Sequence, residues 1–174
     1  MKKYIFFVVL LFITIISCKR SYDFNSWQKD IINSFSKGQT FTYLVNDTDT
    51  ISFIVSDVTY NENGYKNVNI TLTKQGETHY ENISIYMIAD DIPDDNSNNI
   101  DIDMNINNYY YFVSGKIRKG INYPYKGNKI PTVYFLTSSD ETQKDTVIIK
   151  PNTGIIHVVL NSNNQPLSMD ILEK

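Results

Sequence analysis

Apolar and polar residues alternate with a period of two along much of this chain. The alternation is clearest in residues 68–73, 100–106 and 167–171, where valine, isoleucine, leucine and methionine occupy every second position. This pattern predicts β-strands that bury one face and expose the other. Other segments are rich in β-branched and aromatic residues without clean alternation, which predicts strands covered on both faces. These segments are residues 51–55, 83–88, 109–113, 133–136, 147–149 and 155–160.

The connections between these segments are short and carry turn residues, as in Asn107-Asn108 and residues 151–154. Short connections join antiparallel neighbours, because a parallel pair needs a crossover of about a dozen residues or more. We therefore expect a mainly β domain, an antiparallel meander of about nine or ten strands. Such a sheet buries its apolar side as a barrel, a half-barrel or a sandwich, and the spacing favours the barrel family. The longest irregular stretches, residues 90–99 and 119–130, are expected to be loops.

One segment near the N-terminus shows helical spacing instead, with apolar side chains at Phe24, Trp27, Ile31 and Phe35. Asp23 or Asn25 is placed to cap its start, and Gly38 lies just beyond its end. The pattern predicts one amphipathic helix packed on the sheet. The alternative is a helix that lies on a bilayer with Trp27 at the interface.

The first eighteen residues have the character of an export signal. Lys2 and Lys3 precede an apolar run over residues 4–16, which is followed by Ser17 and Cys18. The run fits a secretory signal peptide and is too short to span a bilayer, which takes about 20 residues. Branched aliphatic residues, a small residue and then a cysteine resemble the lipobox of bacterial lipoproteins. The resemblance implies a diacylglyceryl group on Cys18, cleavage after Ser17, and a fatty acyl chain such as palmitate on the new amine.

This resemblance divides the chain into a signal peptide over residues 1–17, a lipidated tether over residues 18–23 and a single β-rich domain with the N-terminal helix over residues 24–174. It implies that the partner of Cys18 is a membrane. In composition, with Ala89 as the one alanine and abundant asparagine, isoleucine, lysine and tyrosine, the chain is similar to small uncharacterised lipoproteins of Bacteroidota. Lys19 follows the cysteine, and no acidic run comes directly after it. In such lipoproteins these features imply an anchor in the outer membrane that faces the periplasm.

Composition narrows the classes of function. Cys18 is the only cysteine, so the domain is expected to fold without a disulfide. The net charge is −3, and removal of Lys2 and Lys3 with the signal peptide makes it more negative. This balance argues against nucleic acid as a partner, because binding to a phosphate backbone needs clustered basic residues.

Sequence signatures of catalysis are lacking. The two histidines are His79 and His157, too few for a multi-histidine metal site. His157 lies within an apolar strand segment, where we expect its ring to be satisfied by hydrogen bonds in the sheet. We also find no glycine-rich phosphate loop and no nucleophile elbow. We therefore expect neither an enzyme nor a cofactor.

The most polar segment is residues 90–103, which begins with four carboxylates that are candidate Ca²⁺ ligands: Asp90, Asp91, Asp94 and Asp95. Hard cations take six to eight oxygen ligands. The segment lacks the glycine of an EF-hand loop, and Pro93 restricts the chain further. The simpler interpretation is a solvated acidic loop without metal.

A second candidate is aromatic, and its members are Tyr109, Tyr111, Tyr123 and Tyr125. Tyrosine combines a wide apolar contact with a polar tip, so these rings are candidates for stacking on a sugar, a peptide or a partner protein. Adjacent residues of a strand point to opposite faces, so alternate members of the run are expected to share one surface. The simpler interpretation is ordinary sheet surface and core.

Three functions follow from these observations. The first is a non-catalytic binding or assembly module anchored in the cell envelope, with an envelope protein or a glycan as its partner. The second is a carrier of an apolar ligand, by analogy of architecture with lipocalins and outer-membrane lipoprotein receptors. The third, ranked lowest, is an enzyme whose site carries no sequence signature.

Overall fold

The computed structural model describes residues 23–61, 66–76, 81–89, 99–137, 145–161 and 166–173. This part of the chain forms one short helix and ten β-strands. The elements are α2 (Ser26–Ile32), β1 (Thr40–Val45), β2 (Asp49–Asn61), β3 (Asn67–Lys74), β4 (Asn82–Ile88), β5 (Asn99–Ile106), β6 (Tyr109–Tyr125), β7 (Asn128–Thr137), β8 (Thr146–Lys150), β9 (Gly154–Leu160) and β10 (Leu167–Glu173).

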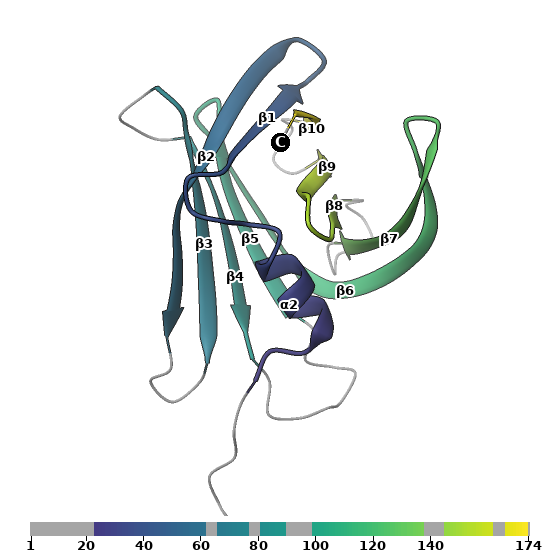
Figure 1. Cartoon of the computed structure of the whole chain (residues 1–174). Coiled ribbons are helices and arrows are strands. Elements are labelled where there is room, and N and C mark those ends of the chain that lie inside the picture. Colours follow the sequence, from purple (N-terminus) through teal and green to yellow (C-terminus); the bar gives the residue numbers. More distant parts are fainter. Residues whose placement is uncertain are drawn as a thin grey trace, which may run out of the picture.

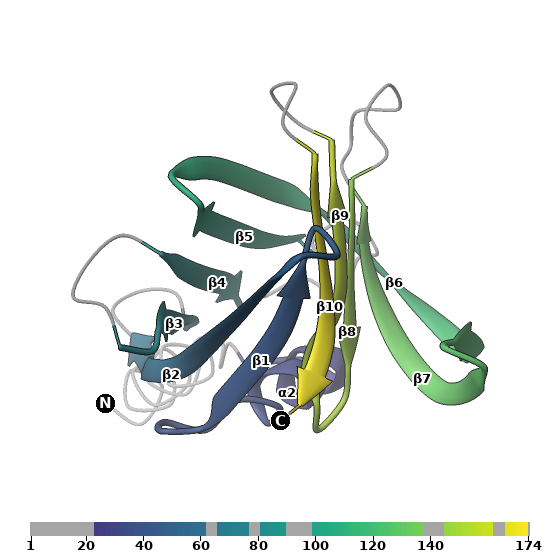
Figure 2. The same ribbon diagram turned by 90° about the horizontal axis from the view of Figure 1, so that it is seen from above.

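The strands form one closed antiparallel barrel in which chain neighbours are also sheet neighbours (Figures 1 and 2). β1 completes the ring, because Tyr43 pairs with Ile51 of β2 on one side and with Ile171 of β10 on the other. Asn107 and Asn108 have φ of 53° and 64° and form a two-residue turn between β5 and β6. The prediction of a mainly β antiparallel barrel is confirmed.

Strict alternation places one side chain in two inside the barrel. In β5, for example, Ile100, Ile102 and Met104 are fully buried, whereas Asp101 and Asp103 between them are partly exposed. The interior-facing side chains of all ten strands belong to one apolar cluster. This burial stabilises the fold and fixes the strand register, because a slip of one residue would turn every apolar side chain outward.

The helix α2 packs against this apolar cluster beside the ends of β4 and β5 (Figure 1). Ile31 is fully buried, and Gln28 Nε2 donates to the carbonyl oxygen of Ile88 at 2.7 Å. The ring of Trp27 lies 6.5 Å from that of Tyr134 in β7. The helix is therefore packed on the domain, as the first of the two predictions had it.

The helix is shorter than the apolar spacing predicted. Asn25 caps its start in a capping box with Gln28, and Asn33 caps its end. Phe35 lies beyond the helix, but its ring is buried and lies 5.4 Å from that of Phe41. The same apolar spacing thus arises from a short helix followed by an extended segment that continues over the core.

Residues 119–130, predicted to be a loop, form regular strand structure instead. β6 pairs with β5 only as far as residue 116, and beyond that point it pairs with β7. The two strands leave the barrel together as a curved two-stranded ribbon (Figures 1 and 2), which we call the β6–β7 ribbon (residues 117–133). Lys126 and Gly127, with φ of 47° and 80°, form the two-residue turn at its tip.

The β6–β7 ribbon covers the outside of the barrel wall. Ile130 and Val133 of the ribbon pack with Ile148 of β8 and Ile156 of β9 in a second apolar cluster. As a result, β8 and the first part of β9 are buried on both faces. In β2 and β4, by contrast, buried side chains alternate with more exposed ones. The prediction of strands covered on both faces is therefore correct for β8, part of β9 and residues 133–136, and wrong for residues 51–55, 83–88 and 109–113.

Candidate functional site

The strongest candidate for a binding surface lies on the outer face of β4, β5 and β6. The register places Ser84, Asp103 and Phe112 in one row across the three strands and Tyr86, Asp101 and Ser114 in the next. Tyr110 lies beyond Phe112, toward the turn between β5 and β6. We call this surface the aromatic face and define it by Tyr86, Asp101, Asp103, Tyr110 and Phe112.

The aromatic rings of this face are open to solvent. Tyr110 is 60% exposed and Phe112 is 50% exposed, and Tyr109 at the neighbouring turn is 46% exposed. Exposed apolar side chains are informative when several lie together on one regular surface, because such patches mark interaction sites. Tyr110 and Phe112, two positions apart on the outer face of β6, meet this condition.

Carboxylates lie beside the rings. The Tyr110 hydroxyl donates a hydrogen bond to Asp103 Oδ1, which links neighbouring strands on the outer face. This hydrogen bond, together with some burial and the negative charge of Asp103, raises the pKa of Tyr110. The face can therefore stack a ring or an apolar side chain on Phe112, and it can accept hydrogen bonds through Asp101 and Asp103.

The four tyrosines predicted from the sequence do not share one surface. Tyr109 is exposed at the β5–β6 turn, whereas Tyr111 points into the barrel and is 4% exposed. Tyr123 and Tyr125 are partly buried in the second apolar cluster, in the distant half of β6. The assignment of Tyr111 to a binding surface is therefore corrected, because its neighbours in register, Met104 and Val113, face the interior.

Sequence reasoning missed Tyr110, Phe112 and the two carboxylates of the aromatic face. The signal was present in β5. Its even-numbered residues, such as Ile102, are apolar and face inward. The two-residue turn at Asn107-Asn108 pairs Asp103 with Phe112. Carried across that turn, the alternation assigns the even-numbered residues of β6 to the outer face.

A second group of titratable side chains lies where the tip of the β6–β7 ribbon meets the barrel wall. Asp170 of β10 accepts a hydrogen bond from the Tyr125 hydroxyl at 2.8 Å, and its Oδ1 lies 2.7 Å from His157 Nδ1. Lys126 Nζ lies 3.9 Å from the same carboxylate. We call Tyr125, Lys126, His157 and Asp170 the ribbon clasp. The prediction that His157 is satisfied within the sheet is confirmed.

Two groups of the ribbon clasp, Asp170 and Tyr125, have shifted pKa values. Burial raises the pKa of Asp170, but the hydrogen bonds from Tyr125 and His157 and the charges of His157 and Lys126 outweigh it, so the net pKa lies below its ordinary value. Burial and the contact with Asp170 raise the pKa of Tyr125. The hydrogen bonds and the ion pair among these groups link the ribbon to β9 and β10. Such an arrangement indicates a structural role, because buried polar groups are paired in stable folds.

No group of three or more histidine, cysteine, aspartate or glutamate side chains suited to a metal ion occurs among the residues that the structure describes. The Ca²⁺ candidates Asp90, Asp91, Asp94 and Asp95 lie outside those residues, as do Ser17, Cys18 and His79. Within the same described ranges, no helix has the length and apolar character needed to cross a membrane.

Comparison with models of known families, with curated proteins and with solved structures found no match.

Proposed function

We propose that this protein is a membrane-anchored, non-catalytic binding module of the cell envelope, which holds an envelope protein on its aromatic face. The lipobox-like segment supports the anchor, with lipid on Cys18 and attachment to the outer membrane. The exposed rings of Tyr110 and Phe112 beside Asp103 carry the proposal of a binding role. Aromatic side chains are enriched at the centres of protein interfaces, where their burial contributes most of the affinity.

The position of the aromatic face relative to the anchor supports this role. Lys66 and Ile88 lie at the helix end of the barrel, where Lys66 Nζ pairs with Asp23 Oδ1 at 3.1 Å and Ile88 bonds to Gln28. β5 runs from this end to the turn at Asn107-Asn108 and rises about 20 Å on the way. Tyr110 and Phe112 therefore lie toward the end of the barrel opposite Asp23.

The packing of the interior favours a binding surface over a carrier. A cavity large enough for an apolar ligand takes several hundred Å³ and leaves accessible area on the side chains that line it. In the interior, the large side chains of Phe41, Tyr43 and Phe53 are fully buried. This close packing supports a ligand on the outside of the barrel.

A photocrosslinking experiment tests the proposal. A benzophenone amino acid replaces Phe112 in the protein in its own cells, and a matched replacement at Thr59, an exposed strand position of β2, serves as the control. We expect a discrete protein adduct from position 112 and none from position 59. An adduct that survives protease digestion and contains sugar would change the partner to a glycan. Equal labelling at both positions, or none, would refute a binding role for this face.

A further inference from the structure

Charge is strongly segregated along the sequence. Residues 104–139 contain no aspartate or glutamate. Five basic residues occur within this stretch, in and beside the β6–β7 ribbon: Lys116, Arg118, Lys119, Lys126 and Lys129. The rest of the chain from Cys18 onward carries nine basic and nineteen acidic residues. A cationic arm on an otherwise acidic protein indicates an anionic partner, because the summed field attracts negative charge to one place.

The basic side chains of the ribbon are exposed and largely unneutralised. Arg118, Lys119 and Lys129 are exposed and form no ion pair with any carboxylate in the described part of the chain. Lys126 lies 3.9 Å from Asp170 but remains half exposed. Cations that stabilise a fold are paired with carboxylates, as Lys29 is with Asp23 at 2.8 Å. The ribbon therefore offers charge that the domain itself does not use.

Ile121 is 71% exposed and is the most exposed of the large apolar side chains in the described residues. It pairs across the ribbon with Thr132, on the face opposite the second apolar cluster. Lys119 precedes it by two positions in the same strand, so the two side chains share that face. An apolar side chain among cations fits the interface of an anionic bilayer, where the chain contacts acyl groups and the cations contact headgroups.

The edges of the ribbon are poorly suited to pairing with a strand of another protein. Pro124 and Pro131 have no backbone N–H to donate, and Lys119 and Lys129 add charge along the two strands. Proline and lysine are the residues that block edge-to-edge pairing in natural sheets. A partner that binds the charged outer face of the ribbon, opposite the second apolar cluster, is thus favoured over a partner that adds a strand to its edge.

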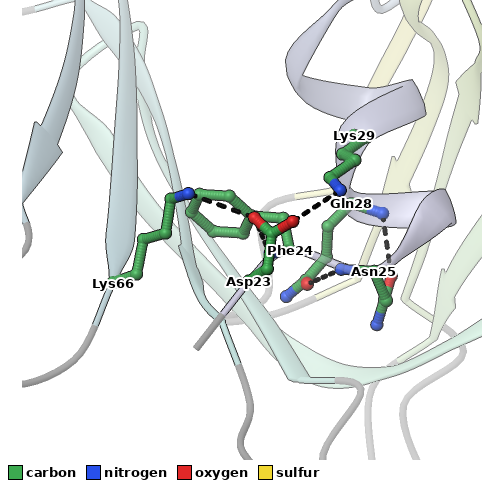
Figure 3. A network of polar contacts seen from close by, with 6 residues as sticks. All are labelled: Asp23, Phe24, Asn25, Gln28, Lys29 and Lys66. Carbon is green, nitrogen blue, oxygen red and sulfur yellow. Dashed lines mark hydrogen bonds and ion pairs between the residues drawn. The ribbon is translucent and has the colours of Figure 1, made fainter. Parts of the chain in front are cut away.

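The base of the ribbon is connected to the point where the tether enters the domain. Lys119 pairs in register with Tyr134, whose hydroxyl donates to Asp30 of α2 at 2.5 Å. At the start of α2, Asp23 is held between Lys29 and Lys66 (Figure 3), and these two lysines lower the pKa of its carboxylate. The tether and the ribbon base are therefore fixed to the same helix.

The tether is short. Five residue steps separate Cys18 from Asp23, and an extended chain spans about 17 Å over that length. A lipid on Cys18 would keep the helix end of the barrel within this distance of the bilayer surface. An anionic membrane would then be the nearest polyanion to the ribbon.

We propose that the outer face of the β6–β7 ribbon binds the anionic headgroups of the bilayer that holds the lipid anchor, with Ile121 inserted between Lys119 and Lys129. The inference rests on the lipid anchor of the proposed function. It assigns the domain one orientation, with the ribbon on the membrane and the aromatic face turned away from it.

Lysine footprinting tests the orientation. The mature lipidated protein is reconstituted in vesicles of phosphatidylethanolamine alone or with one quarter phosphatidylglycerol, and it is then pulsed with a membrane-impermeant acetylating reagent. We expect Lys119 and Lys129 to react several-fold more slowly on the anionic vesicles. Lys37, which is exposed beside β2 on the opposite wall, should react equally on both. In the variant Lys119→Gln the protection of Lys129 should be weakened, whereas Lys37→Gln should retain it.

The outcomes separate the two proposals. A protein that carries the acyl mass on Cys18 but shows equal lysine reactivity on both vesicles would overturn the ribbon's membrane contact and leave the anchor standing. A protein without the acyl mass would overturn the anchor first. Protection of the ribbon lysines by soluble heparin, without protection on anionic vesicles, would assign the ribbon to an anionic polysaccharide and also overturn the membrane contact.

Discussion

Replacement of Asp170 by alanine should loosen the β6–β7 ribbon from the barrel wall. The carboxylate accepts from Tyr125 at 2.8 Å and lies 2.7 Å from His157 Nδ1. Hydrogen bonds to a charged group contribute about 1.5–3 kcal/mol each when buried. The side chain of Asp170 is 22% exposed, and without it the single proton of the Tyr125 hydroxyl can be donated to the carbonyl of Ile156, which lies 2.9 Å away. We therefore expect a loss of about 1–2 kcal/mol for the variant.

The loss should depend on pH, because the net pKa of Asp170 in the folded protein is lowered. A lowered carboxyl pKa contributes stability that is present above the unfolded value of about 3.9 and is lost as the pH falls through the folded value. The difference between the native protein and Asp170→Ala should therefore be complete at pH 7. It should shrink as the pH falls below about 4.

Urea unfolding at pH 7 and at pH 3 measures both effects. With an m-value of about 2 kcal/mol per molar urea, the midpoint at pH 7 should fall by about 0.5–1 M. Amide exchange in the ribbon should rise in parallel, because Ile130 and Val133 would lose contact with the wall. Asp47→Asn is the matched control, since Asp47 is exposed in a turn at φ 58°, where asparagine is well tolerated. An unchanged midpoint at pH 7, or the same loss at both pH values, would refute this account of the ribbon clasp.

Three further substitutions test the packing. Gly120→Ala places a Cβ 2.3 Å from the ring of Phe135, so we expect a loss of about 1–3 kcal/mol in thermal unfolding; recovery by Phe135→Leu would support the clash, and an unchanged Tm would contradict it. Ile31→Ala removes a fully buried side chain of α2 and should cost about 2–5 kcal/mol in urea unfolding, and a loss below 1 kcal/mol would mean that the helix adds little to the core. Tyr43→Phe deletes the hydrogen bond to the Ile155 carbonyl at 3.1 Å and should cost about 1–3 kcal/mol, whereas a neutral result would show that this carbonyl finds another donor.

The alternation of apolar and polar residues and the short turns predicted an antiparallel meander that forms a barrel, a half-barrel or a sandwich, with the barrel family favoured. The described side chains of β5 from Ile100 to Ile106 follow this alternation. The β6–β7 ribbon was missed because Gly120, Pro124 and Pro131 interrupt its pattern. Asn122, at φ 52°, also changes which face the following side chains share. Strand structure there depends on the Lys126-Gly127 turn and on packing against Ile148 and Ile156, which are distant in sequence.

In the candidate site, too, the residue types could be recognised in the sequence, but their exposure depends on contacts between distant segments. Tyr111 and Phe112 are adjacent in an aromatic run, and only the register against β5 decides which of them is exposed. The pairing of His157 with Asp170 could not be read from the sequence, since it depends on the register between β9 and β10. The positive charge of the ribbon can be counted in the sequence. The proposal that the ribbon contacts a membrane also required the exposure of Ile121 and the position of α2, which only the structure gives.

Mass spectrometry of the intact protein isolated from its own membranes tests the central claim most directly. The account predicts a chain that begins at Cys18 and carries the mass of a diacylglyceryl group, with a further fatty acyl chain on the amine. A chain that retains residues 1–17, or one that begins elsewhere without acyl mass, would contradict the anchor and the orientation derived from it.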